Sequence, residues 1–121
     1  VTDMSNMFNR NSAFNQDISN WNISSVTNMY YMFYGNEIFN QDIGNWDTRS
    51  VTDMRGVFYN SLAFNQDIGN WNVSNVTTMR DMFHNSPVFN QDLSSWNVIN
   101  VSDYANFYYN TPQWTLPKPL F

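Results

Sequence analysis

The stretch FNQDIGNWDTRSVTDMRGVF, from Phe39 to Phe58, decides the fold because its residue pattern recurs along the chain at a constant interval of 25 residues. No insertion or deletion interrupts the interval, and successive units start at Val1, Val26, Val51, Val76 and Val101. A fixed period of this length is typical of repeat proteins. One such unit cannot bury its apolar face alone, so neighbouring units must cover one another. The sequence therefore predicts a solenoid of about four and a half repeats over residues 1–110.

The first half of each unit has the spacing of a short helix. Intervals of three and four residues among Val26, Met29, Met32 and Phe33 place these side chains on one side of a helix. Thr27 is suited to cap its start, because a Thr side chain accepts hydrogen bonds from the first N–H groups of a helix. The predicted helix has about two turns and depends on the stack for its stability.

The second half has the spacing of a short strand. Trp21 and Ile23 lie two residues apart, so both point inward while their polar neighbours point outward. Ile18, Trp21 and Ile23 together also resemble the L-x-x-L-x-L core of leucine-rich repeats. The predicted fold class is α/β: a leucine-rich-repeat-like right-handed solenoid with one short parallel strand and one short helix per 25-residue turn.

The sequence of the whole unit resembles the repeats of a known group of proteins. Phe39 to Phe58, and the motif F-N-Q-D-[IL]-x-x-W that recurs four times, are similar to BspA-like leucine-rich repeat surface proteins of the DUF285 type, with repeats of about 25 residues. The resemblance implies a curved α/β solenoid on secreted or surface-anchored microbial proteins, often in adhesion or host contact. Two features depart from standard leucine-rich repeats: Val26 stands in place of the usual ladder Asn, and Trp replaces the central Leu.

Composition argues against several classes of partner. The net charge is −5, and the five basic residues do not cluster as a phosphate track requires, so we expect no nucleic-acid binding. No apolar run approaches the roughly 20 residues of a membrane span, so we expect no membrane insertion. Cysteine is absent, which leaves no disulfide or thiolate metal site.

Catalysis has little support in the sequence. The chain has one His, His84, and one Glu, Glu37, and no set of nucleophile, base and orienting group can be named. We therefore predict a protein that is not an enzyme and that has no cofactor.

Stacking turns equivalent positions into rows. The Asn row and the Gln row are expected to form amide ladders that hold the turns together (Asn15, Asn40, Asn65 and Asn90; Gln16, Gln41, Gln66 and Gln91). The Asp row suggests calcium, since Ca²⁺ prefers carboxylate and carbonyl oxygens (Asp17, Asp42, Asp67 and Asp92). Its alternative role, capping of local backbone N–H groups, is favoured, because the alternating ligands of calcium-binding repeats are missing.

An aromatic row is the first candidate binding surface: Tyr34, Tyr59, His84 and Tyr109. Rings in line at a regular spacing can contact a partner or stack on sugars. Additional rings at Tyr30, Tyr31 and Tyr108 widen the surface. The alternative is structural, with each ring covering the end of the next turn's helix.

A second candidate surface is the polar face of the predicted sheet: Asn20, Asn22, Asn45, Asp47, Arg49, Asn70, Asn72 and Asn97. The alternative is that these side chains are simply solvated. Four N-x-S/T sequences are glycosylation candidates, and such acceptors also arise by composition in a repeat rich in Asn, Ser and Thr: Asn22, Asn72, Asn75 and Asn100.

The two ends of the array differ. Residues 111–121 lack the F-N-Q-D-I motif and contain Pro117 and Pro119 instead. Proline has no backbone N–H to donate to a neighbouring strand, so we predict that this segment is a C-terminal cap or tail. Two hypotheses explain the start: the chain is the last stretch of a longer array, or its first turn docks on the end of another copy. End-to-end contact candidates are Val1, Met4, Phe8, Trp114, Leu116 and Phe121.

The sequence thus favours a non-enzymatic extracellular repeat module of a surface or adhesin-like protein, which displays an extended binding face to a protein or glycan surface. The alternative is a structural subunit that assembles with copies of itself, end to end, into an extracellular filament. Either function places the protein outside the cell or on the cell surface.

Overall fold

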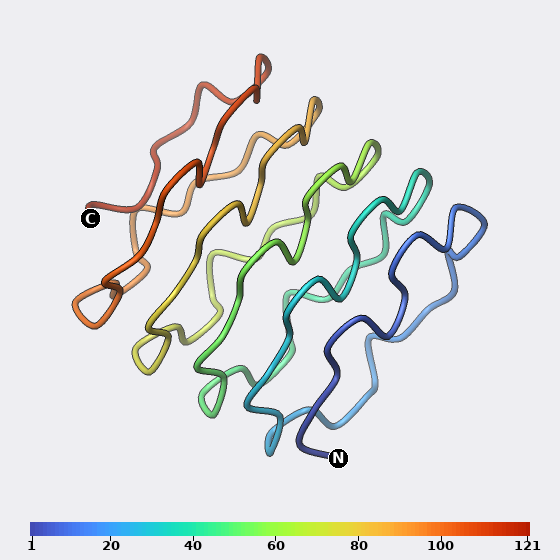
Figure 1. Ribbon diagram of the computed structural model, residues 1–121, viewed down its shortest axis with the longest axis horizontal. Helices are drawn as coiled ribbons and strands as arrows, with labels where there is room; N and C mark the ends of the chain where they lie inside the picture. Colours follow the sequence, from blue (N-terminus) through green and yellow to red (C-terminus); the bar gives the residue numbers. More distant parts are fainter.

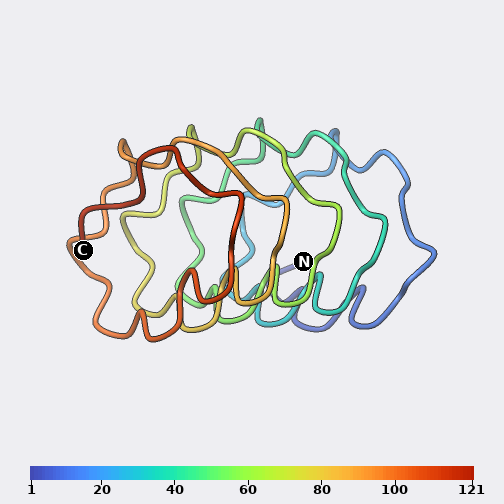
Figure 2. The ribbon, with the colours of Figure 1, turned by 90° about the horizontal axis from the view of Figure 1, so that it is seen from above.

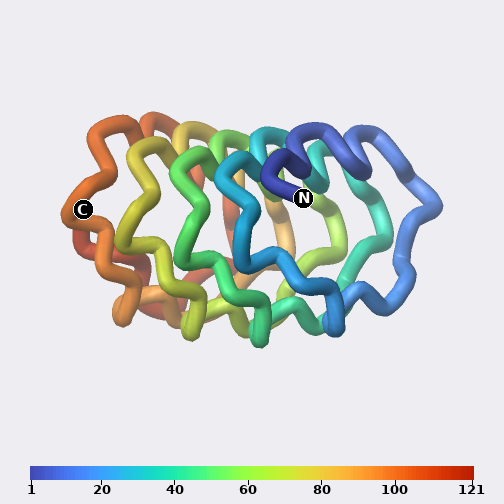
Figure 3. The backbone as a smooth tube through the Cα atoms, turned by 90° about the horizontal axis from the view of Figure 1, so that it is seen from below, coloured from blue at the N-terminus to red at the C-terminus, as the bar shows by residue number.

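The computed structural model describes residues 1–121, which wind into coils stacked side by side along one axis (Figure 1). Each coil takes 25 residues, because bonds between neighbouring coils join residues of that separation, such as Asn15 to Asn40 and Asn40 to Asn65. The first coil and the last coil lie at opposite ends of the stack, and the coils enclose a common interior (Figures 2 and 3).

The chain forms no helix and no strand in residues 1–121. Its only ladder contacts are isolated parallel bridges at the third residue of each unit: Asp3–Asn28, Asn28–Asp53, Asp53–Thr78 and Thr78–Asp103. The predicted α/β fold, with one helix and one strand in each leucine-rich-repeat-like turn, is therefore wrong. The coils are built from consecutive turns.

Left-handed residues prevent the predicted helix. The backbone φ is positive at the sixth and tenth residues of every unit, whereas a right-handed helix requires negative φ throughout. In the second coil these residues are Tyr31, with φ of 54°, and Gly35, with φ of 66°. The other left-handed residues are Asn6, Arg10, Gly56, Asn60, Asp81, Asn85, Asn106 and Asn110.

Backbone N–H groups of this half alternate between two kinds of partner. In the first coil the N–H groups of Met7, Asn9 and Asn11 each donate to the carbonyl three residues earlier. The N–H groups between them donate instead to carbonyls of the next coil, so both sets of donors are satisfied. These bonds run from Met4 to Asn28 (2.9 Å), Asn6 to Tyr30 (2.8 Å), Phe8 to Met32 (3.0 Å) and Arg10 to Tyr34 (2.6 Å).

Two tight turns replace the predicted strand. The N–H of Trp21 donates to the carbonyl of Ile18, and the N–H of Val26 donates to that of Ile23. Asn22 fixes the second turn, because its Oδ1 accepts the N–H of Ser24 at 3.1 Å. The only backbone hydrogen bond from this segment to the next coil is that of Leu93 to Pro117, between the fourth and fifth coils, so no sheet forms there.

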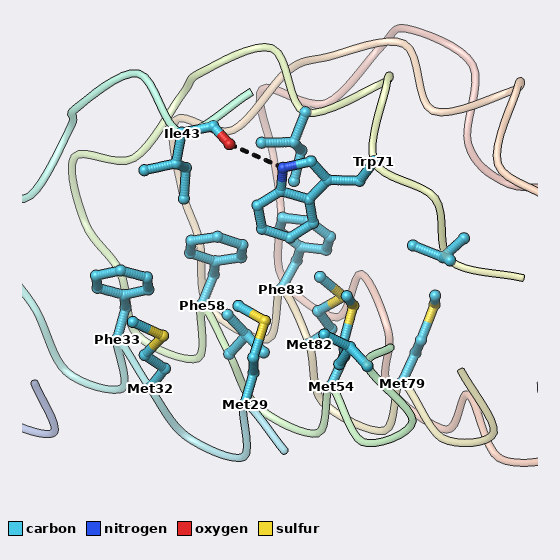
Figure 4. Close-up of a cluster of buried hydrophobic side chains, with 14 of the residues drawn as sticks. Met29, Met32, Phe33, Ile43, Met54, Phe58, Trp71, Met79, Met82 and Phe83 are labelled. Atoms are coloured by element: carbon cyan, nitrogen blue, oxygen red, sulfur yellow. Dashed lines mark hydrogen bonds between the residues drawn. The ribbon is translucent and has the colours of Figure 1, made fainter. Parts of the chain in front are cut away.

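Side chains join the coils in this second half. The indole Nε1–H of Trp71 donates to the carbonyl of Ile43 at 2.9 Å, from one coil to the one before (Figure 4). Trp46 and Trp96 make the same bond to Ile18 and Ile68. The predicted amide ladders are present as well: in the first three coils the Asn Oδ1 accepts the backbone N–H of the Asn and the Nε2–H of the Gln in the next coil.

Asn65 is a central member of the Asn ladder. Its Oδ1 accepts the N–H of Asn90 at 2.8 Å and the Nε2–H of Gln91 at 3.0 Å. We expect Asn65→Ala to lower the free energy of unfolding by about 1 kcal/mol, because at this exposed position the N–H of Asn90 loses its acceptor and the Nε2–H of Gln91 keeps only the Asn65 carbonyl. Urea unfolding measures this change. Asn65→Asp keeps the acceptor oxygen and should cost clearly less; equal losses for the two variants would contradict the role of the ladder.

Stacked rings and methionines fill the interior. Phe33, Phe58 and Phe83 are fully buried and lie in one column, with centroid separations of 5.7 and 5.4 Å, beside a row of Met29, Met54 and Met79 (Figure 4). Two further columns run parallel to it: Phe14, Phe39, Phe64 and Phe89; and Trp46, Trp71 and Trp96. Every inner coil thus packs apolar surface against both neighbours.

Residues 111–121 complete the fifth coil. Trp114 is buried and takes the place of the core Phe, with its ring edge-on to Phe89 at 4.8 Å. The carbonyl of Pro117 accepts the N–H of Leu93, so this proline serves as an acceptor toward the fourth coil. Phe121 packs against Tyr104 and Phe107 of the same coil.

Candidate functional site

Six rings are in contact along one side of the stack, and we call this surface the tyrosine face. It is formed by Tyr30, Tyr31, Tyr34, Tyr59, His84 and Tyr109, which come from four successive coils. Centroids of consecutive rings are 4.1, 5.0, 5.0, 4.4 and 4.8 Å apart in that order. The predicted aromatic row, Tyr34 to Tyr109, is therefore brought together in space.

The turns of each coil direct these rings outward. Met29, Met32 and Phe33 point into the core and are fully buried, so the residues next to them, such as Tyr30 and Tyr34, lie on the outer side. Tyr31 extends along the stack over the third coil. Its ring lies directly on Gly56, where a Cβ atom would overlap the ring carbons.

Charged groups surround the rings. The guanidinium of Arg10 lies 5.4 Å from the Tyr34 centroid, and that of Arg55 lies 4.8 Å from the Tyr30 centroid, both in cation–π geometry. Nδ1 of His84 lies 3.2 Å from Oδ1 of Asp81.

Burial is the main cause that raises the pKa of Tyr31 and of Tyr59 above the usual value of 10.0. The neighbouring Tyr30 adds to the effect on Tyr31, and the negative charge of Asp81 adds to the effect on both. Both phenols therefore remain protonated at neutral pH and keep a hydroxyl donor.

Ring stacking limits the chemistry of this face. The planes of Tyr30 and Tyr31 are 11° apart, and those of Tyr59 and His84 are 6° apart, so their faces largely cover one another. Tyr109, at the end of the row, is 60% exposed. The tyrosine face thus offers mainly ring edges, hydroxyls and guanidinium groups rather than free aromatic planes.

Sequence reasoning named four members of this row as the site and treated Tyr30 and Tyr31 only as additions. It did not identify Gly56 or Asp81. Both stand at the sixth position of the unit, where the second coil has Tyr31. The available signal was that the residue at this position varies between coils.

A family comparison gives the relationship of the chain. A family model described as "Mycoplasma protein of unknown function, DUF285" matches residues 1–62 and 36–118. The chain belongs to the DUF285 family. The DUF285 part of the predicted resemblance is confirmed. No curated protein and no solved structure matches the chain.

The second candidate surface of this DUF285 chain lies in turns, because there is no sheet. Its residues fall into two rows, of which one forms turns: Asn22, Asp47, Asn72 and Asn97 each accept the N–H two residues later. Asn20, Asn45 and Asn70 are exposed. Arg49 pairs with Asp47 at 3.3 Å on the surface.

The four glycosylation candidates differ in whether the side-chain amide nitrogen, Nδ2, donates a hydrogen bond within the chain. Nδ2 of Asn75 donates to the carbonyl of Arg49, and Nδ2 of Asn100 donates to that of Ser74, both at 2.7 Å. In Asn22 and Asn72 only Oδ1 is hydrogen-bonded, to the N–H and hydroxyl of the Ser two residues later. Modification remains a prediction for all four.

The Asp row accepts local backbone N–H groups. In each of the first four coils a carboxylate Oδ1 of this row accepts the backbone N–H two residues later, at 2.9–3.0 Å: Asp17, Asp42, Asp67 and Asp92. This is the capping role that the sequence favours. No group of three or more His, Asp or Glu side chains is placed to hold a metal ion. The structure also has no helix long and apolar enough to cross a membrane.

Hydrogen bonds from Ser94, first from its hydroxyl and then from its N–H, lower the pKa of Asp92 below its ordinary value of 3.8. A carboxyl whose pKa is lower in the folded chain contributes stability above the unfolded value and loses it as the pH falls through the folded value. We expect Ser94→Ala to raise the pKa of Asp92 toward 3.8, as an NMR carboxyl titration would show. Ser19→Ala is the control and should leave Asp92 unchanged; an unchanged Asp92 in Ser94→Ala would contradict the assignment.

Proposed function

We propose that this chain is a non-enzymatic binding module of a BspA-like surface protein, displayed outside the cell, and that its tyrosine face binds a protein partner. The observation that carries the proposal is the unbroken contact of six rings across four coils, with Arg10 and Arg55 packed on them. Tyr and Arg are the residues that most often dominate the energy of protein interfaces.

The stacking of the rings favours a protein over a glycan as the partner. Sugars bind aromatic side chains through the open ring plane, and here the stacked pairs Tyr30–Tyr31, Tyr31–Tyr34 and Tyr59–His84 cover part of these planes. A protein contact can use the edges, hydroxyls and guanidinium groups that the tyrosine face offers. Adhesion to a host surface is the role that the BspA-like resemblance suggests for such a face.

The test measures attachment of the purified chain to cultured epithelial cells, before and after trypsin treatment of the cells, and to a panel of immobilised glycans. We expect trypsin-sensitive attachment to cells, and at least about a tenfold loss in the double variant Tyr34→Ala and Tyr59→Ala, because truncation of two central interface tyrosines commonly costs this much. Thermal unfolding of the double variant must show that it is folded under the assay conditions.

The control is Asn20→Ala with Asn45→Ala, two exposed residues outside the tyrosine face. Binding of the chain to glycans alone would replace the protein partner with a carbohydrate. Unchanged attachment of the tyrosine double variant, or absence of attachment by the natural sequence, would overturn the proposal.

A further inference from the structure

The outer faces of the first and last coils carry complementary rows of unpaired backbone groups. On the first coil, the carbonyls of the third, fifth, seventh and ninth residues accept no hydrogen bond: Asp3, Ser5, Met7 and Asn9. On the last coil, the N–H groups of the fourth, sixth, eighth and tenth residues donate none: Tyr104, Asn106, Tyr108 and Asn110. Unpaired rows of this kind are templates for association.

The same groups join every pair of coils inside the chain. Between the third and fourth coils, for example, the N–H donors of the even-numbered positions meet the carbonyls of the odd-numbered ones at 2.9–3.1 Å. These bonds run from Met54 to Thr78, Gly56 to Arg80, Phe58 to Met82 and Asn60 to His84. If the first coil of one copy lay on the last coil of another at the distance found between coils inside the chain, four backbone hydrogen bonds would form. Their register would be the one that joins successive coils within the chain.

We propose that a second copy of this chain docks in this way, with its first coil on the last coil of its neighbour. This inference does not depend on the function proposed for the tyrosine face.

Apolar surface is concentrated at the same two faces. Nine of the thirteen large exposed apolar residues belong to the first or fifth coil. Met7 is 44% and Trp21 is 39% exposed, whereas Met32 and Trp46, their counterparts in the second coil, are covered by the first coil and are buried. Docking would bury Met7 and Trp21 in the same manner, which supplies the hydrophobic driving force.

The side-chain contacts of the second half also continue across the junction. Nε1 of Trp21 has no partner within the chain, while Trp46 donates to Ile18 of the coil before. On a docked copy, the equivalent acceptor for Trp21 is the carbonyl of the neighbour's Lys118. Phe121 has the sequence position of Trp21 on the last coil, but its ring packs on Tyr104 and Phe107 of its own coil, so the Trp column itself ends at Trp96.

The contact joins two different surfaces, so each added copy leaves the same two faces open. A head-to-tail contact of this type builds an open filament when its rotation does not close a ring. A further coil of a longer chain would use the same bonds. The purified 121-residue chain is the sample for the test, because its first and last coils carry the two faces that the proposal joins.

The test uses two variants, each with a charge on one face. Met7→Lys alters the first coil, and Tyr108→Glu alters the last coil at a residue that is 52% exposed. Sedimentation velocity and electron microscopy of the natural sequence should show growth with concentration and fibres one chain wide. Each variant alone should associate at least about tenfold more weakly, because docking would bury a charged side chain where the natural sequence has an apolar or aromatic one.

A one-to-one mixture of the two variants gives the decisive measurement. The intact last coil of Met7→Lys fits the intact first coil of Tyr108→Glu, so the mixture should form a dimer and nothing larger. Ile99→Lys, at a residue 81% exposed on an inner coil, should assemble like the natural sequence. A natural chain that stays monomeric at all concentrations, or a folded Met7→Lys variant that still forms fibres, would overturn the proposal, as would a mixture that stays monomeric.

Discussion

Replacement of Phe58 by alanine is expected to lower the free energy of unfolding by about 3–5 kcal/mol, the usual cost of removing a large aromatic side chain from a packed core. Phe58 is fully buried in the middle coil. Its ring lies 4.1 Å from Phe64 within the coil, and 5.7 and 5.4 Å from Phe33 and Phe83 of the two adjacent coils. A cavity here therefore weakens both interfaces of the third coil at once.

Urea unfolding followed by circular dichroism measures this effect. The matched control is Ile99→Ala, at a residue that is 81% exposed, and it should change stability by no more than about 0.5 kcal/mol. A loss of less than about 1 kcal/mol for Phe58→Ala would show that the aromatic column contributes little to stability. Each coil contacts only its neighbours, so there is no distant part of the core to compensate.

The sequence predicted the inward side chains of each unit better than the backbone that carries them. Met29, Met32 and Phe33 are buried, as their spacing indicates. That spacing does not distinguish a helix from consecutive turns, because turns closed by bonds over three residues also return a side chain to the same side every three or four positions. Gly35 and Gly56 inside the expected helix were the available warning, since glycine readily takes positive φ.

The strand prediction failed for a related reason. Alternation of Trp21 and Ile23 over three residues is too short to define a strand, and Asn22 between them forms a turn with Ser24. Asn and Asp recur two residues before Ser or Gly throughout the chain, as in Asp42 with Gly44. Each of these pairs closes a turn, and between residues 18 and 26 of the first unit the backbone hydrogen bonds stay within the coil rather than forming a sheet along the stack.

The candidate site was partly predictable. The register alone placed Tyr34, Tyr59 and His84 in one row, and the structure brings these rings into contact. The reach of Tyr31 along the stack was not predictable, because it depends on a left-handed backbone at Tyr31 itself and on the missing side chain of Gly56. Contacts of this kind arise where a single residue differs from the repeat. A consensus sequence of the five units does not show such residues.

Gly56 gives the second large effect. Its φ is +58°, and its Cα lies under the Tyr31 ring. We expect Gly56→Ala to lower the free energy of unfolding by about 2–4 kcal/mol: about 1–2 kcal/mol from the left-handed backbone, and the rest from displacement of the Tyr31 ring out of its stack. Gly35→Ala is the matched control. Its φ is +66°, but the new Cβ would come no closer than 3.4 Å to any atom, at Arg10 Cγ, so it should show the backbone cost alone.

Removal of the ring separates the two causes. In a Tyr31→Ala background the space above Gly56 is empty, so Gly56→Ala should cost about as much as Gly35→Ala. The coupling between the two substitutions, measured from urea unfolding of the four proteins in the cycle, should be at least about 1 kcal/mol. A coupling near zero would mean that the Tyr31 ring moves aside without loss. The stacking of Tyr31 with Tyr30 and Tyr34 would then be an adaptable arrangement rather than a fixed part of the tyrosine face.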